Sequence, residues 1–214
     1  MKLFIDSADT QAIYEAFKTG LIDGVTTNPT LIKKSGRDPF EVYQELINIG
    51  IPDVSMEVTG SLLEMMEQSD LILNTFGNSI PTIKVPCTKD GLAVCKNLSE
   101  KGIRVNVTLV FSTAQAILAA KAGARYVSPF IGRYDDNSLA GAELVRAIVS
   151  TYRVQGVKTQ VLAASVRDVY KVGRAFFNGA DIVTVPPSVF DKMFDHVLTD
   201  KGLEIFEEDA KELG

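Results

Sequence analysis

The sequence has no tryptophan, one histidine and two cysteines, Cys87 and Cys95. It contains no CxxC pair and no Cys/His cluster, so it predicts no metal site. Two cysteines cannot form a disulfide framework, and both are expected to be reduced thiols, as in a cytoplasmic protein. The single histidine, His196, lies near the end of an expected helix and is assigned a structural role.

The sequence also lacks an excess of basic residues and a long hydrophobic run. It has 22 Lys and Arg against 27 Asp and Glu, which gives a formal net charge of -5. Proteins that bind nucleic acid normally carry a basic face or stripe, so nucleic acid is not an expected partner. Polar residues such as Asn106 and Gln115 interrupt the longest apolar-leaning segment, residues 105–120, and the first ten residues lack the apolar core of a signal peptide. We therefore expect no membrane segment and a cytoplasmic location.

The residues that are present fit one globular domain. Apolar residues make up 46% and charged residues 23% of the 214 residues, and no low-complexity tract interrupts them. No linker or composition break divides the chain. We expect residues 1–214 to form a single domain.

Short β-rich runs alternate with helical patterns along the whole chain. The expected strands are residues 2–6, 24–28, 54–58, 82–86, 104–110, 126–131, 160–164 and 181–185. The expected helices are residues 10–19, 39–48, 62–76, 92–101, 113–122, 140–154, 167–178 and 188–197. Strict alternation implies parallel strands joined by helical crossovers, and eight such units predict an α/β (β/α)₈ TIM barrel. The alternative is an open doubly wound sheet, but no GxGxxG turn follows the first strand.

One further helical pattern follows the eighth unit, at residues 200–213. It carries Leu203, Phe206, Ala210 and Leu213 at helical spacing. We expect this additional C-terminal helix to pack over the barrel or onto a neighbouring subunit.

Lys84 interrupts an apolar strand, although lysine is among the residues least often buried without a partner. Alternate residues of a barrel strand point inward, so the polar residues of each strand should share one parity. In the segment TIKV, Lys84 shares its parity with Thr82, and the residues between and after them are apolar. We therefore expect Lys84 to point into the barrel.

Active sites of this fold lie at the C-terminal mouth, where the strands end. Polar residues of the expected strands are candidates to meet there. They are Asp6, Asn28, Glu57, Lys84, Asn106, Thr108, Ser128 and Ser165.

Two interpretations of an inward lysine are open. Lys84 could form a buried structural ion pair with Glu57 or Asp6, although replacing such a pair by apolar residues is often neutral for stability. Alternatively, desolvation favours the neutral amine, which attacks carbonyl groups and forms a Schiff base. Barrel position and parity favour the catalytic interpretation.

Six short segments, spread from the first expected strand to the end of the seventh, carry a resemblance to a known family. They are FIDSAD (4–9), DGVTTNPTLI (23–32), IKVP (83–86), VNVTLVFS (105–112), YVSPFIGR (126–133) and AASVR (163–167). Together they resemble the small transaldolases and the related fructose-6-phosphate aldolases, class I Schiff-base enzymes.

The resemblance implies roles for the strand-end residues. Lys84 would form the Schiff base, and Asp6 would take the proton of the C4 hydroxyl as the C3–C4 bond of a ketose phosphate breaks. Glu57 and Thr108 would hold a catalytic water. The dihydroxyacetone unit would be held or flanked by four residues: Thr26, Asn28, Asn106 and Ser128.

Three further residues, Arg133, Ser165 and Arg167, would bind the terminal phosphate according to the resemblance. Guanidinium groups suit this task because they donate paired hydrogen bonds in a fixed fork. The alternative is that the two arginines form solvated salt bridges with nearby aspartates of the same loops.

Two positions separate the two activities of the family. The resemblance implies that transaldolases carry glutamate and phenylalanine where the aldolases carry glutamine and tyrosine, and this sequence has Glu57 and Phe130. A phenyl ring lacks the hydroxyl that would help water to release the bound enamine. Both choices favour transaldolase.

The predicted function is therefore transaldolase, with sugar phosphates as substrates and no cofactor. It would move dihydroxyacetone units between sedoheptulose 7-phosphate or fructose 6-phosphate and aldose phosphates, in the non-oxidative pentose phosphate pathway. Two alternatives are a fructose-6-phosphate aldolase that releases free dihydroxyacetone and a phosphosugar-binding protein without turnover. The resemblance also implies a homo-oligomer, a decamer of two stacked pentamers.

Overall fold

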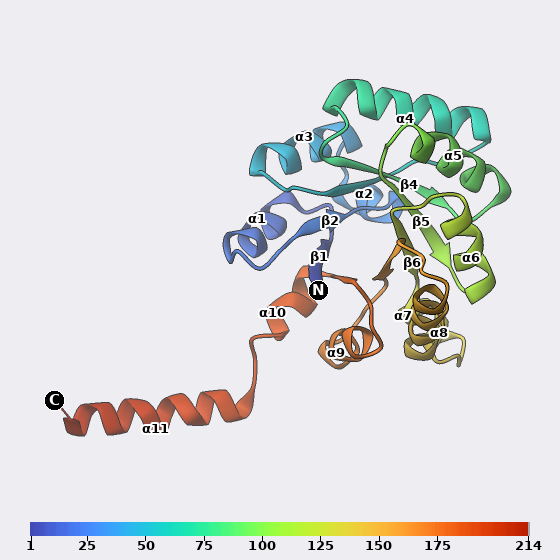
Figure 1. The fold of residues 1–214 in the computed structure, drawn as a ribbon. Helices are drawn as coiled ribbons and strands as arrows, with labels where there is room; N and C mark the ends of the chain where they lie inside the picture. Colours follow the sequence, from blue (N-terminus) through green and yellow to red (C-terminus); the bar gives the residue numbers. More distant parts are fainter. Residues whose placement is uncertain (214) are drawn as a thin grey trace.

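The computed structural model describes residues 1–213 and shows a closed barrel of parallel strands surrounded by helices (Figure 1). Strands that follow each other in the chain are neighbours in the barrel, and pairing of the first strand with the last closes it. The strands are β1 (Lys2–Asp6), β2 (Gly24–Thr26), β3 (Val54–Glu57), β4 (Pro81–Pro86), β5 (Val105–Val110), β6 (Tyr126–Pro129), β7 (Gln160–Ala163) and β8 (Ile182–Val185). The expected (β/α)₈ barrel is confirmed, and the open doubly wound sheet is wrong.

Each strand is followed by a helix, and the first seven of these helices return the chain to the start of the next strand. These helices are α1 (Thr10–Lys18), α3 (Pro39–Ile49), α4 (Leu62–Phe76), α5 (Lys89–Glu100), α6 (Thr113–Lys121), α8 (Gly141–Val154), α9 (Val169–Phe177) and α10 (Pro187–Lys192). The short helices α2 (Pro29–Ser35) and α7 (Ile131–Asp136) precede α3 and α8, and α11 (Val197–Leu213) ends the described chain. Within residues 1–213, no helix has both the length and the apolar composition that a membrane span requires.

Two strands end earlier than the sequence predicts because a short helix begins there. β2 stops at Thr26 instead of residue 28, since Asn28 is the N-cap of α2 and its side-chain oxygen accepts a hydrogen bond from the Leu31 amide at 3.0 Å. Pro29 occupies the first helical position, which suits its fixed φ. β6 likewise stops at Pro129, because α7 begins two residues later.

Two helices near the C-terminus also differ from the expectation. Asp168 caps α9, and its side chain accepts a hydrogen bond from the Lys171 amide at 2.8 Å. The helix therefore begins after Arg167, which stays in the loop at the mouth of the barrel. α10 ends at Lys192, so His196 lies outside it and instead accepts a hydrogen bond from the Leu198 amide at the start of α11.

Apolar side chains form two layers of core. The outward faces of the strands pack against the helices, and residues such as Ile5, Val25 and Ile83 are fully buried there. A smaller cluster lies inside the barrel. Its buried members are Phe4, Tyr126, Phe130, Leu162, Ala164 and Ile182.

A polar cluster closes the N-terminal end of the barrel. The buried carboxylate of Asp53 accepts hydrogen bonds from Thr82 Oγ1 at 2.8 Å and Tyr126 Oη at 2.7 Å, and it pairs with Arg104 at 3.2 Å. The chain of Gly24 passes so close that a Cβ there would lie 2.8 Å from the Asp53 carbonyl oxygen and 2.6 Å from the Phe4 ring. With this end filled, the open mouth lies at the C-terminal ends of the strands.

The C-terminal helix α11 does not pack over the barrel of its own chain. None of its residues, all of which the structure describes, is buried, and Figure 1 shows it projecting away from the barrel beyond α10. Of the two arrangements expected from the sequence, packing over the barrel is wrong for this chain. Packing onto a neighbouring subunit stays a prediction.

Candidate active site

Lys84 projects from β4 into the barrel, where its side chain is only 4% exposed. Its Nζ lies 2.8 Å from Glu57 Oε2 and donates a hydrogen bond to the Thr27 carbonyl oxygen at 2.9 Å. Glu57 is the register partner of Lys84 on the adjacent strand β3, so strand pairing alone brings the two groups together. The buried ion pair that the sequence leaves open is thus present with Glu57.

Asp6 ends β1 and lines the cavity into which Lys84 also points, at the C-terminal mouth of the barrel. Thr26 Oγ1 donates a hydrogen bond to Asp6 Oδ1 at 2.7 Å. Burial raises the pKa of Asp6 above the ordinary value of an aspartate, while the positive charge of Lys84 and the hydrogen bond from Thr26 oppose that rise. A carboxylate with a raised pKa next to an amine is a typical general base.

The cavity at the mouth brings together most of the residues that the sequence indicates. It is lined by Asp6, Thr26, Asn28, Lys84, Ser128, Phe130, Arg133, Leu162, Ala164, Ser165 and Thr184. Glu57, Asn106, Thr108 and Arg167 do not line it directly. Glu57 and Asn106 instead contact lining residues from behind.

Asn106 is held by hydroxyl groups on both sides. Its side-chain oxygen accepts a hydrogen bond from Ser128 at 2.7 Å, and its Nδ2 donates to Ser55 Oγ at 3.3 Å. Asn106 is also the register partner of Lys84 across β4 and β5. Thr108, two residues along β5, has a buried hydroxyl without a hydrogen-bond partner among residues 1–213.

Phe130 lies close to two cationic side chains of the cavity, Lys84 and Arg133. Its ring centroid is 6.0 Å from Lys84 Nζ and 5.1 Å from the guanidinium carbon of Arg133. The residue as a whole is 9% exposed. The ring is therefore within reach of both cations of the site.

Arg167 adopts the surface ion pair that was the alternative to phosphate binding. Its two terminal nitrogens face the two carboxylate oxygens of Asp136, with 2.6 Å between Nη2 and Oδ2. The guanidinium group holds the pKa of Asp136 below its usual range. Arg133, in contrast, is exposed at the cavity rim.

Ser165 has a left-handed backbone, with φ of 59°. This conformation is uncommon outside glycine and occurs where the surrounding structure enforces it. Gly132 at the start of α7 packs against it so closely that a Cβ would lie 2.1 Å from the Ser165 carbonyl oxygen. Any side chain at residue 132 would therefore displace Ser165 from the cavity wall.

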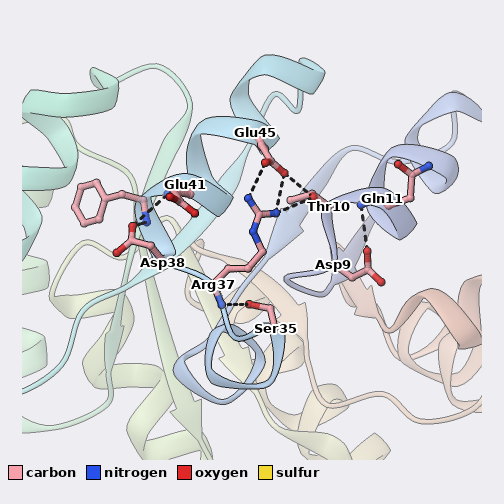
Figure 2. Close-up of polar contacts among 9 residues, drawn as sticks. Asp9, Thr10, Gln11, Ser35, Arg37, Asp38, Glu41 and Glu45 are labelled. Carbon is pink, nitrogen blue, oxygen red and sulfur yellow. Dashed lines mark hydrogen bonds and ion pairs between the residues drawn. The ribbon is translucent and has the colours of Figure 1, made fainter.

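An anchor outside the cavity holds α2, the short helix that Asn28 caps. Arg37, just after this helix, makes paired contacts of 2.9 and 2.6 Å with the Glu45 carboxylate of α3, and Thr10 of α1 donates to the same carboxylate at 2.7 Å (Figure 2). The pairing with Arg37 lowers the pKa of Glu45 to about 2. No residue of α2 is fully buried, so this anchor and the Asn28 cap add to the packing of the partly buried Leu31 and Ile32 in holding the helix in place.

Comparison with known proteins identifies the family. Residues 3–214 match the family described as Transaldolase/Fructose-6-phosphate aldolase. The chain belongs to this transaldolase/fructose-6-phosphate aldolase family.

Relatives of similar length support the assignment to this family. A "Probable transaldolase" of Roseobacter denitrificans is 50% identical over 214 residues, which cover 100% of this chain and 98% of the relative. Another, from a Chelativorans species, is 51% identical over 215 residues with the same coverage. A thiamine phosphate pyrophosphorylase structure from Pyrococcus furiosus has a TM-score of 0.60 at 17% identity and covers 88% of this chain and 87% of its own. At that identity the likeness shows the barrel fold alone.

Thr184 and Thr27 are site residues that the sequence interpretation missed in this member of the transaldolase/fructose-6-phosphate aldolase family. Thr184 alternates with apolar residues in IVTV of β8, so the parity rule that indicated Lys84 could have found it. Thr27 acts through its backbone carbonyl, for which side-chain patterns give no signal. Within residues 1–213, no three His, Cys, Asp or Glu side chains are grouped in a way that could hold a metal ion.

Proposed function

We propose that this protein is a transaldolase that transfers dihydroxyacetone units between sugar phosphates through a Schiff base on Lys84. The donors would be sedoheptulose 7-phosphate or fructose 6-phosphate, and the acceptors glyceraldehyde 3-phosphate or erythrose 4-phosphate, as in the non-oxidative pentose phosphate pathway. The observation that carries the proposal is the enclosed amine of Lys84, 2.8 Å from the Glu57 carboxylate and on the same cavity as Asp6. Membership in the family narrows the chemistry to the two activities of its description.

The first stage joins Lys84 to the ketose. Glu57 accepts a proton from Nζ, and the free amine attacks the C2 carbonyl carbon, whose oxygen takes up the proton that the nitrogen then loses, to give a neutral carbinolamine. The C2 hydroxyl then leaves as water with the proton from Glu57, while the nitrogen lone pair forms the iminium. The buried Thr108 hydroxyl, which has no protein partner among residues 1–213, supports a role in holding water at this stage.

The second stage breaks the C3–C4 bond. Asp6 accepts the C4 hydroxyl proton, the oxygen electrons form the aldehyde carbonyl, and the bond electrons flow to the iminium and leave an enamine on Lys84. The iminium is the electron sink, so this cleavage needs no metal. The aldose phosphate departs, an acceptor aldehyde enters, and the same steps run in reverse.

Other cavity residues fit the two ends of the substrate. Thr26, Asn28 and Ser128 line the Lys84 end, where the dihydroxyacetone unit would be held, and Asn106 flanks it by holding Ser128 from behind. Arg133 and Ser165 lie on the cavity and would bind the terminal phosphate. Arg167 would join them by exchanging Asp136 for the dianionic phosphate, because exposed ion pairs are weak and phosphate accepts paired hydrogen bonds from guanidinium.

Phe130 favours transaldolase over aldolase. Its ring lines the cavity near Lys84 and offers no hydroxyl to deliver water to the enamine. The bound enamine would therefore wait for an aldose acceptor.

Acceptor dependence tests the proposal. Fructose 6-phosphate alone should release one equivalent of glyceraldehyde 3-phosphate per site, and erythrose 4-phosphate should restore turnover. Turnover without an acceptor, with free dihydroxyacetone as product, would favour the aldolase. Borohydride reduction in the presence of fructose 6-phosphate should leave the sugar on Lys84, and an unmodified Lys84 would favour a binding protein without turnover.

We also propose that the protein is a homo-oligomer, with two stacked pentamers forming a decamer. The exposed helix α11 supports the existence of a neighbouring subunit. Its apolar side chains would need such a partner to leave solvent.

A further inference from the structure

Thr184 lies where its hydroxyl can act on Asp6 through Thr26. β8 and β2 flank β1 on its two sides, and the Oγ1 atoms of Thr184 and Thr26 lie 2.7 Å apart. Thr26 Oγ1 is also 2.7 Å from Asp6 Oδ1. The three side chains therefore form a chain of two hydrogen bonds that ends at the carboxylate.

The chemistry of the groups fixes the direction of this chain. An ionised carboxylate only accepts hydrogen bonds, and each hydroxyl has a single hydrogen to donate. Thr26 uses its hydrogen toward Asp6, so the bond between the two threonines needs the hydrogen of Thr184. Either hydroxyl could donate on geometry alone, and the charge of Asp6 leaves only one arrangement.

We propose that Thr184 is a positioning residue for the cleavage step, because it holds the Thr26 hydroxyl as a donor to Asp6 Oδ1. This bond fixes the carboxylate so that its other oxygen remains available to the substrate. The inference rests on the proposed function, in which Asp6 takes the C4 hydroxyl proton.

The bond from Thr184 also affects the charge state of Asp6. A hydroxyl that accepts a hydrogen bond becomes a stronger donor, so Thr184 strengthens the bond by which Thr26 opposes the raised pKa of Asp6. The charged groups facing Asp6 are Lys84 from β4, with Glu57 of β3 against it, and Arg133 of α7 on the same cavity. None of them is altered by a substitution in β8.

The test compares Thr184→Val, which keeps the shape and removes the hydroxyl, with Thr184→Ser, which keeps the hydroxyl. Single-turnover release of glyceraldehyde 3-phosphate from fructose 6-phosphate is measured across pH. For Thr184→Val we expect cleavage to slow by about tenfold, the acid limb to move to higher pH, and KM to stay unchanged. Thr184→Ser should restore both the rate and the pH profile.

A matched control separates positioning from general stability. Thr82→Val removes a buried threonine-to-aspartate hydrogen bond at the closed end of the barrel, and it should lower the melting temperature without moving the acid limb. An unchanged rate and pH profile in Thr184→Val would overturn the inference. A slower rate whose acid limb lies at the same pH as in Thr82→Val would also overturn it. If Thr184→Val does not fold, Thr184→Ala is judged by the same two criteria.

Borohydride trapping distinguishes this inference from the proposed function. An adduct on Lys84 in both wild type and Thr184→Val, with normal cleavage in the variant, would overturn the role of Thr184 alone. No adduct in the wild type would overturn the proposed function and this inference with it.

Discussion

At the scale of the residue, Lys84 Nζ is enclosed by oxygen atoms. The Glu57 carboxylate and the Thr27 carbonyl oxygen lie 2.8 and 2.9 Å from Nζ. Stability alone explains such a pair poorly, because apolar residues of similar volume often serve as well. A carboxylate that can accept the proton of the amine gives the buried pair a chemical purpose.

Replacing Lys84 tests this purpose directly. Lys84→Arg keeps a positive charge beside Glu57 but removes the primary amine that a Schiff base requires. We expect turnover and the borohydride adduct to be lost while the circular dichroism spectrum stays folded. Lys89→Arg, on the exposed start of α5, is the matched control and should keep full activity. Measurable turnover in folded Lys84→Arg would place the nucleophile elsewhere.

The ionised form of Asp6 would serve catalysis, whereas its burial disfavours the folded state. Burial raises its pKa in the folded state, so the folded protein binds the Asp6 proton more tightly than the unfolded chain does. Its contribution to stability is therefore greatest at low pH and declines as pH rises through the raised pKa. Near neutral pH the buried charge opposes folding.

Asp6→Asn should consequently slow cleavage by about 10²- to 10⁴-fold without lowering the urea midpoint at pH 7. Imine formation should persist, because Lys84 and Glu57 are intact. The difference in midpoint between variant and wild type should shrink as pH falls toward 4. Asp90→Asn, on the exposed first turn of α5, serves as control and should change neither quantity. Normal single-turnover cleavage in Asp6→Asn would remove Asp6 from its role.

Side-chain parity located most of the candidate site because strand geometry is local. The alternation in TIKV placed Lys84 inward, where the structure has it, and register then set Glu57 and Asn106 beside it. The partner of Arg167 was not predictable in the same way. Asp136 lies 31 residues away in sequence, and several aspartates of the two loops were equally suitable. Tertiary packing chose among them.

At the level of elements, α2 is held by the Asn28 cap, by the partial burial of Leu31 and Ile32, and by an anchor at its C-terminal end. The contacts among Arg37, Glu45 and Thr10 join the end of α2 to α3 and α1 (Figure 2). Gly36 makes the turn into this anchor with a left-handed φ of 67°. Because Asn28 caps the other end of α2, the anchor sets how firmly one wall of the cavity is held.

Loosening the anchor should weaken substrate binding without slowing the cleavage step. For Glu45→Gln we expect KM for fructose 6-phosphate to rise about two- to fivefold, in line with an exposed ion pair, while the single-turnover cleavage rate stays near that of wild type. Since the pKa of Glu45 is lowered to about 2, the ion pair is present above the ordinary glutamate pKa and is lost only as pH falls toward 2. The rise in KM should therefore be equal at pH 5 and pH 8. Glu15→Gln, which breaks the exposed pair with Lys18 on α1, is the control and should leave KM unchanged.

The short helices α2 and α7 were not predicted from the sequence, for two different reasons. α2 carries readable signals, an Asn cap followed by Pro at the first position, which were overlooked inside an expected strand end. α7 has no side-chain cap and begins directly after the bridge between Phe130 and Ala164. Its fold depends on packing of Gly132 against Ser165, which no local pattern encodes.

On the scale of the whole molecule, the closed barrel was predictable because every unit repeats the same strand and helix order. The position of α11 was not predictable, because its pattern specifies an apolar face and not its partner. Leu203 and Phe206 are 54% and 70% exposed, and the helix touches nothing that buries them. Isolated helices of this length are marginal in water, so packing against another surface is needed to hold it.

A charge on this face should therefore disassemble the protein. We expect wild type to scatter light as a decamer, ten chains of 23.3 kDa or about 233 kDa, and Phe206→Glu to yield smaller species with the barrel still folded. Glu207→Gln, on the neighbouring exposed residue, is the control and should keep the wild-type mass. A wild-type protein that scatters as a monomer would show that no second copy covers α11. Assembly unchanged in Phe206→Glu would mean that this residue lies outside the interface.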